Sequence, residues 1–125
     1  MRFLLDTHIV YWARVQPHFL PPHIADTLLN PNYEIYYSVI CPWELAIKEA
    51  KKKIHLPEAF FSTFADTGFD VLAITDKHVE ALRKLPRLHG DPFDRMLAAQ
   101  AASENMTLIT HDKRLASYPV RTIVI

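Results

Sequence analysis

Four acidic residues follow predicted strands or lie at the start of predicted helices. Asp6 comes directly after one apolar run, and Asp112 comes two residues after Thr110, which ends another. Asp94 opens an alanine-rich helix, and Glu44 lies in the first turn of a helix that starts on a proline. Carboxylate oxygens are the ligands that Mg²⁺ and Mn²⁺ prefer, and these ions assist attack on phosphodiesters. The residue types therefore indicate metal-assisted phosphodiester hydrolysis, provided that the fold brings the acids together.

Each acid taken alone also has a purely structural interpretation. Asp and Glu are favoured at helix N-termini, where they accept hydrogen bonds from backbone N–H groups. Their interaction with the helix dipole stabilises the helix by roughly 0.3–1 kcal/mol each. Glu44 fits a capping-box acid with Cys41 as the cap, while Asp94 and Asp112 fit ordinary caps. Asp6 fits this interpretation least well, because it ends a strand that we expect to be buried. The functional hypothesis depends on all four acids sharing one edge.

Short apolar runs predict five strands. They lie at Arg2–Leu5, Glu34–Val39, Asp70–Ile74, Thr107–Thr110 and Arg121–Ile125. The first four read as strands buried on both faces, which is typical of a parallel sheet. The direction and pairing of the last strand are left open.

Helical patterns alternate with these strands. They predict helices at Pro22–Leu29, Pro42–Lys53, Glu58–Ala65, Asp76–Leu85 with Thr75 as its N-cap, and Asp94–Glu104. Alternating strands and helices predict an α/β fold with helices on both sides of a parallel sheet. Such sheets bind ligands at the carboxyl ends of their strands. If the first and fourth strands are neighbours, Asp6 and Asp112 meet at that edge.

The composition of the 125 residues describes one domain, 1–125, without a membrane partner. Half of the chain is hydrophobic, and no signal peptide or membrane span is predicted. A lone cysteine excludes an internal disulfide and a Cys-based zinc cage, so we expect a reducing, cytoplasmic location. The formal net charge is zero, with 14 basic and 14 acidic residues. Without the four proposed ligands the rest of the chain carries +4, so neutrality combines an acidic pocket with a mildly basic body.

Histidines allow a second interpretation of the chemistry. No His pair has ligand spacing on a helix and H-E-x-x-H is absent, which argues against zinc. A nuclease without metal, using two of His8, His89 and His111 as acid and base, stays open as an alternative. The other four are expected at the surface or its boundary: His18, His23, His55 and His78. Only two glycines are present, which excludes a P-loop and a Rossmann fingerprint.

Hydroxyl and basic side chains flank the acids. Thr7 and Thr110 each sit beside a proposed ligand and have hydroxyls that can orient a carboxylate. Lys48, four residues after Glu44, pairs with it or points to substrate phosphate. Arg95, Lys113 and Arg114 lie beside Asp94 or Asp112 and are expected to hold the backbone phosphates of a substrate near the metal. The remaining aromatic residues read as core or interface: Tyr11, Trp12, Tyr33, Tyr36, Tyr37, Phe60, Phe61 and Phe64.

Four segments resemble, in order and spacing, the PIN-domain ribonucleases, and among them the VapC-type toxins of toxin–antitoxin pairs. They are Leu4-Leu5-Asp6-Thr7-His8, Trp43-Glu44-Leu45-Ala46-Ile47-Lys48, the run from His89 to Gln100 with Asp91-Pro92-Phe93-Asp94-Arg95, and Leu108-Ile109-Thr110-His111-Asp112. The resemblance spans essentially the whole chain. Each motif alone is weak, but four in the right order are specific.

The resemblance implies a PIN-like α/β/α sandwich with a central, mainly parallel five-stranded sheet. It implies RNA cleavage with Mg²⁺ or Mn²⁺, a homodimer, and a VapB-like antitoxin whose tail covers the active site. Carried over by position, the catalytic, metal-binding acids are Asp6, Glu44, Asp94 and Asp112. Asp91 competes with Asp94, which is preferred because Asp91-Pro92 reads as the entry to a helix. The alternative is a catalytically inactive PIN-fold module that binds RNA or a protein.

Overall fold

The centre of the fold is a five-stranded sheet in which every strand runs in the same direction. The computed structural model describes residues 1–64 and 66–125. The strands are β1 (Arg2–Leu5), β2 (Glu34–Ser38), β3 (Asp70–Leu72), β4 (Thr107–Thr110) and β5 (Thr122–Val124), in the order β3-β2-β1-β4-β5. All neighbouring pairs are parallel, including β4 with β5. The predicted contact between the first and fourth strands is therefore confirmed.

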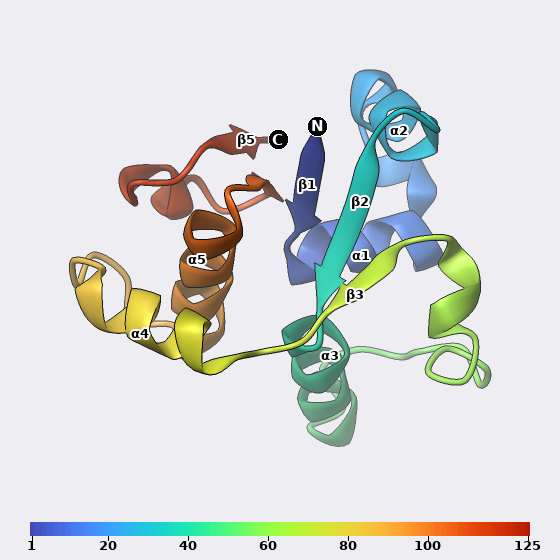
Figure 1. Ribbon diagram of the computed structural model, residues 1–125. Coiled ribbons are helices and arrows are strands. Elements are labelled where there is room, and N and C mark those ends of the chain that lie inside the picture. The colour runs from blue at the N-terminus through green and yellow to red at the C-terminus, as the bar shows by residue number, and fades with distance from the viewer.

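Helices cover both faces of this sheet, as Figure 1 shows. Side chains alternate along β1, so that Phe3 and Leu5 enter one core and Leu4 enters the other. The first core is closed by α1 (Thr7–Val15) and α2 (Pro22–Leu29), and the second by α4 (Asp76–Lys84) and α5 (Pro92–Glu104). The predicted α/β/α sandwich is confirmed. No helix within the described residues is both long and apolar enough to span a bilayer.

Helix α1 was not predicted from the sequence. It begins directly after Asp6, whose carboxylate accepts a hydrogen bond from the Ile9 N–H at 3.0 Å and so caps the helix. Its β-branched and aromatic residues have modest helix propensity. Ile9 and Val10 are fully buried against the sheet, so packing and the cap outweigh that propensity.

In the middle of the chain, one predicted strand is shorter and more exposed than expected, and one predicted helix is wrong. The strand expected at Asp70–Ile74 shortens to β3 at the edge of the sheet, where Val71 is 55% exposed instead of buried on both sides. A helix was expected at Glu58–Ala65. Residues 58–63 instead form turns, which are followed by a 3-10 helix, η2 (Phe64–Thr67); Ala65 lies outside the described residues. The Arg14 guanidinium donates to the Phe60 carbonyl at 2.7 Å, so that oxygen is bonded outside the local backbone.

One helix has other boundaries than expected, two short helices were not predicted, and one histidine is buried instead of exposed. The third helix, α3 (Ile40–Ala50), begins two residues earlier than Pro42 and ends three residues before Lys53. Two further 3-10 helices, η1 (Pro17–Phe19) and η3 (Lys113–Ser117), complete the fold. Finally, His78 is 1% exposed, contrary to the surface position expected for it, because its Nδ1 accepts the Thr75 N–H at 3.0 Å and caps α4.

Candidate active site

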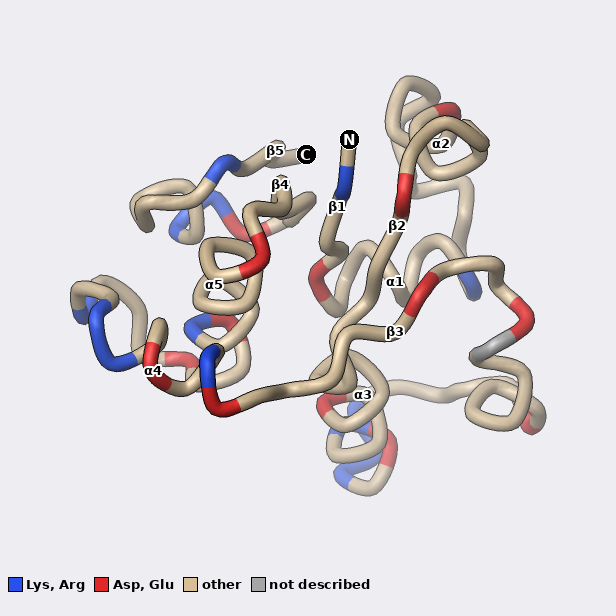
Figure 2. The backbone as a smooth tube through the Cα atoms, in the orientation of Figure 1, with Lys and Arg blue, Asp and Glu red and all other residues tan. Residues whose placement is uncertain are grey.

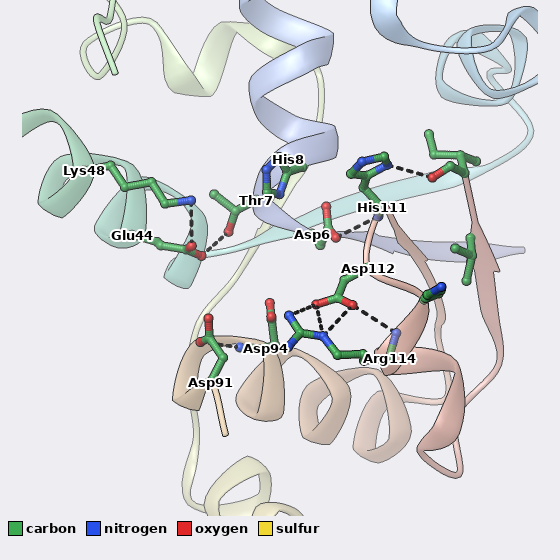
Figure 3. A pocket seen from close by; sticks show the side chains of 13 residues that line it. Asp6, Thr7, His8, Glu44, Lys48, Asp91, Asp94, His111, Asp112 and Arg114 are labelled. Atoms are coloured by element: carbon green, nitrogen blue, oxygen red, sulfur yellow. Dashed lines mark hydrogen bonds and ion pairs between the residues drawn. The ribbon is translucent and has the colours of Figure 1, made fainter. Parts of the chain in front are cut away.

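The carboxyl edge of the sheet opens into a cleft of about 620 Å³. All four predicted acids line it, together with Asp91 and with basic residues from α3 and η3 (Figure 3). The acids come from four separate elements, and Figure 2 shows acidic positions on the segments that meet there. The structure thus brings together the residues that the sequence had placed on one edge.

Asp6 is the most buried acid of the cleft, with 3% exposure. It follows β1, and one carboxylate oxygen accepts from the Ile9 N–H while the other accepts from the Thr110 hydroxyl and from the His111 N–H at 3.1 Å. Burial raises the pKa of Asp6, although these hydrogen bonds oppose the shift. The side chain is held rigidly across the crevice between β1 and β4, and Thr110 orients it as predicted.

Glu44 projects from α3 on the opposite wall. Its Oε1 accepts from the Thr7 hydroxyl at 2.7 Å, and its Oε2 lies 3.1 Å from the Lys48 ammonium. Because α3 begins at Ile40, Glu44 is not in the first turn and does not form a capping box. Cys41 is not a cap either: it is fully buried, with its Sγ 3.6 Å from the Leu5 carbonyl. The predicted pair between Glu44 and Lys48 is confirmed.

Asp91 and Asp94 have different positions at the start of α5. Asp91 is the N-cap, and its Oδ1 accepts from the N–H groups of Phe93 at 2.8 Å and Asp94 at 3.3 Å. Asp94 lies in the first turn without a capping bond of its own. Burial, reinforced by the charges of Asp91, Asp6 and Glu44, raises the pKa of Asp94 to about 7, and His89 opposes the shift. The interpretation of Asp91-Pro92 as the helix entry is confirmed.

Asp112 caps η3 and is bound to an arginine. It accepts from the Arg114 N–H at 2.9 Å and, through both oxygens, from the Arg114 guanidinium at 2.8 to 3.2 Å. These bonds hold the pKa of Asp112 well below its usual range. Arg114 therefore lies near Asp112 as expected, but its guanidinium binds the Asp112 carboxylate.

His89 links two of the acids, a role that sequence reasoning missed. Its Nε2 lies 3.1 Å from Asp94 Oδ2 and 3.1 Å from Asp112 Oδ2. Its Nδ1 accepts from the Asp91 N–H at 3.1 Å, and this bond assigns the proton of a neutral ring to Nε2. The three side chains could hold an ion by distance alone. With Nδ1 as an acceptor, however, Nε2 has no lone pair for a metal, so His89 acts as a donor that positions both carboxylates.

Basic residues surround the cleft unevenly. Lys48, Lys113 and Arg114 line it. Arg95, expected to hold an RNA backbone here, instead donates to the Pro86 carbonyl at 3.0 Å and to the Tyr118 hydroxyl at 3.3 Å. Its helix position next to Asp94 turns it away, because consecutive residues face different sides of a helix.

Comparisons with known proteins agree with this geometry. The family model described as PIN domain matches residues 3–120. The chain is 29% identical over 118 residues to Ribonuclease VapC22 of Mycobacterium tuberculosis, covering 92% of this chain and 90% of that protein. A chain in the crystal structure of VapBC2 from Rickettsia felis, bound to a promoter DNA fragment, superposes with a TM-score of 0.76 at 22% identity over 99% of this chain and 98% of that one. A chain in DNA-bound VapBC from Salmonella typhimurium gives a TM-score of 0.71 at 21% identity, with 99% and 98% covered.

Proposed function

The chain belongs to the PIN-domain family, and from this premise we propose that it is a metal-dependent endoribonuclease, the toxin of a toxin–antitoxin pair. The observation that carries the proposal is the convergence of Asp6, Glu44, Asp94 and Asp112 on one cleft. The similarity to a protein named Ribonuclease VapC22 supports RNA as the substrate. The similarity to VapBC structures supports a VapB-like antitoxin as the partner.

The donor set of the cleft fits a hard divalent cation, Mg²⁺ or Mn²⁺. The available ligands are carboxylate oxygens, since His89 uses Nδ1 as an acceptor and points a proton at the acids. Burial raises the pKa values of Asp6 and Asp94, and the negative charges of Asp91, Asp6 and Glu44 raise that of Asp94 further, so the carboxylates repel one another at Asp94. A bound cation would relieve that repulsion, and the residues to hold it are Asp6, Glu44, Asp94 and Asp112.

The chain's own residues have separable roles in this proposal. A divalent cation bound to the acids would supply charge stabilisation at the scissile phosphate and activate water. Asp6 is locked by three donors and fixes the position of the site between β1 and β4. His89 Nε2 holds Asp94 and Asp112 at a constant separation, as outer hydrogen bonds commonly do around carboxylate ligands. Lys48 and Arg114 lie where they can bind the phosphates of an incoming strand.

Cleavage assays with the purified chain test the proposal directly. RNA should be cut with Mg²⁺ or Mn²⁺, and cutting should stop with chelator and in Asp6→Asn and Asp94→Asn. Retained RNA binding without cleavage in any metal would instead identify an inactive binding module. Cleavage that survives chelator and fails in His8→Ala or His111→Ala would identify a metal-free histidine nuclease.

The assembly forms a separate part of the proposal. We expect a homodimer, and a VapB-like antitoxin that covers the cleft and inhibits cleavage. Trp43 and Leu88 are 55% and 53% exposed, which supports a protein contact near the start of α3 and α5. Light scattering should give the mass of a dimer, and the antitoxin encoded next to this chain should abolish cleavage at an equimolar ratio. A monomer insensitive to that antitoxin would contradict both expectations.

A further inference from the structure

A second hollow of about 260 Å³ lies between α1 and α3, directly beside the carboxylate cleft. The two hollows share Thr7, His8 and Lys48 in their walls, so they adjoin each other. We propose that the second hollow binds one unpaired base of the RNA, next to the phosphate that is cut. This proposal rests on the proposed ribonuclease function and names the part of the substrate that α1 recognises.

Aromatic rings form one side of the proposed base subsite. The Trp12 ring centroid lies 5.9 Å from that of His8 and 4.7 Å from that of His111, and Trp12 stacks on Phe19 at 5.7 Å and 24°. His8 and His111 are exposed, and Trp12 is half-buried. Unpaired bases stack on aromatic side chains, and such stacking tolerates any base because every base has a π face. His8 lines both hollows, Trp12 lines the second and His111 the carboxylate cleft, so these three rings lie where a base next to the cut phosphate would lie.

Helical spacing explains why the side chains of α1 meet here. His8, Trp12 and Gln16 are four residues apart and therefore share one face of α1. Gln16 supplies an amide that can donate to and accept from a base edge. Buried Leu45 from α3 contributes an apolar wall. The hollow thus combines a flat aromatic side, an apolar side and an amide, which suits a flat ring with polar edges.

The charges of the subsite favour a polyanion over an acidic peptide or an apolar helix. Of the described residues that line the hollow, Lys48 is the one lysine or arginine, and none is an aspartate or glutamate. The Lys48 ammonium, 3.1 Å from Glu44 Oε2, lies between the two hollows. A strand whose base enters the subsite would place its phosphate beside Lys48 and the next phosphate at the carboxylates. An antitoxin segment is the competing occupant, and the experiment below separates the two.

Fluorescence of Trp12 tests base binding without any need for cleavage. Because the chain has two tryptophans, Trp43→Phe leaves Trp12 as the only one, and Asp94→Asn in the same protein prevents turnover. This protein is titrated in Mg²⁺ with a single-stranded RNA hexamer and with an abasic hexamer of equal charge. We expect the base-bearing RNA to quench Trp12 and to bind roughly tenfold more tightly than the abasic strand. Equal quenching and equal affinity for the two strands would overturn the proposal.

Cleavage kinetics give an independent test in the active protein. His8→Ala, Gln16→Ala and Trp12→Leu should each raise KM, by up to roughly tenfold for Trp12→Leu, and leave kcat close to that of the wild type. An RNA that is abasic at the recognised position should be cut equally well by wild type and Trp12→Leu. Phe61→Leu removes an aromatic ring that is 41% exposed and lies outside both hollows, and it should change neither constant.

The two tests distinguish failure of this inference from failure of the proposed function. If the wild type cuts no RNA in any metal, the ribonuclease proposal fails, and the quenching experiment still decides whether a base binds. His8→Ala and Gln16→Ala alter exposed or half-buried side chains, so they remain informative if Trp12→Leu does not fold. If a peptide of the cognate antitoxin quenches Trp12 and RNA does not, the hollow docks a protein and the proposal is wrong.

Discussion

The acids of the cleft form two pairs that are held in different ways. Asp6 and Asp94, the inner pair, are bound by a hydroxyl, backbone N–H groups and an imidazole N–H. Glu44 and Asp112, the outer pair, each face a lysine or an arginine. Burial raises the pKa values of both inner acids, with like charge adding to the shift at Asp94, whereas Arg114 lowers the pKa of Asp112.

This difference indicates where the proposed cation would have the largest effect. The inner acids lie at the junctions of β1 with α1 and of α5 with its cap, and no lysine or arginine of the described residues forms an ion pair with either. The outer acids are paired instead with Lys48 and Arg114, whose side chains are 31% and 65% exposed. In the proposed mechanism a divalent cation would relieve the repulsion at the inner pair, while the more exposed outer bases would turn to a substrate phosphate.

Removing the charge of an inner acid should have the largest effect. Asp6→Asn and Asp94→Asn are expected to lower kcat for RNA cleavage by about 10³-fold or more, because a catalytic metal contributes several kcal/mol to transition-state stabilisation. Glu44→Gln and Asp112→Asn should lose less, about 10²-fold. Initial rates on a labelled RNA with Mg²⁺ and with Mn²⁺ measure this order.

A matched control accompanies these four variants. Asp26→Asn removes an exposed carboxylate from α2, outside the cleft, and should cleave like the wild type. Equal losses in all four site variants would remove the distinction between inner and outer acids. Undiminished cleavage in Asp6→Asn would contradict the metal mechanism as a whole.

When a chelator removes metal ions, ionisation of Asp6 and Asp94 should lower the free energy of unfolding as the pH rises. The pKa of Asp94 is about 7 in the folded protein against 3.8 for the free side chain, so the folded state holds the proton more tightly. The free energy of unfolding therefore falls between about pH 4 and pH 7, and Asp6 acts in the same direction. An isolated shift of this size corresponds to about 4 kcal/mol, and partial exposure reduces our expectation to about 2 kcal/mol.

Urea denaturation in chelator tests this expectation. Asp94→Asn should exceed the wild type by about 2 kcal/mol at pH 8 and match it near pH 4, because the asparagine cannot ionise. Added Mg²⁺ should stabilise the wild type and leave Asp94→Asn nearly unchanged, since only binding to the folded state raises stability. A difference that is constant from pH 4 to pH 8 would mean that ionisation of Asp94 is not its cause.

His89 joins the inner and outer pairs and gives the third test. His89→Ala removes the donor between Asp94 Oδ2 and Asp112 Oδ2, and we expect metal affinity to fall by about tenfold. His89→Gln keeps an N–H donor and should lose less. Calorimetric titration with Mn²⁺ measures the affinity directly. If both variants bound Mn²⁺ more weakly by 10³-fold, His89 would be a ligand and our assignment of its proton would be wrong.

The edge of the sheet could be predicted from the sequence better than the contacts along it. The apolar runs of β1 and β4 and the acids that follow them identify the carboxyl edge, because the rule for parallel sheets depends only on strand direction. The bridging role of His89 could not be predicted, since it depends on a loop bringing Nε2 between acids from two other elements.

Helix α1 and the 58–63 turns show the same limit. The helix depends on burial of Ile9 and Val10 and on capping by Asp6, and the turns depend on Arg14 from a distant segment. Local propensity predicted neither, because both outcomes come from tertiary contacts. The expectation that Asp6 is the least cap-like of the four acids was wrong: an aspartate directly after a buried strand is a good N-cap, and this was the one sequence signal for α1.

The smallest expected effect is that of Arg114→Gln. It tests whether Arg114 binds a substrate phosphate or only neutralises Asp112. If Arg114 turns to a phosphate, Arg114→Gln should raise KM for RNA a few-fold at low salt, leave kcat nearly unchanged, and reduce the salt dependence of log KM by about 0.7 per decade. Arg83→Gln is the matched control: its side chain is 73% exposed, pairs with Glu80 and lies on α4 away from the cleft, so both constants should be unaffected. If Arg114 only neutralises Asp112, Arg114→Gln should leave KM and its salt dependence unchanged and should tighten Mn²⁺ binding, because the carboxylate is then free for the cation.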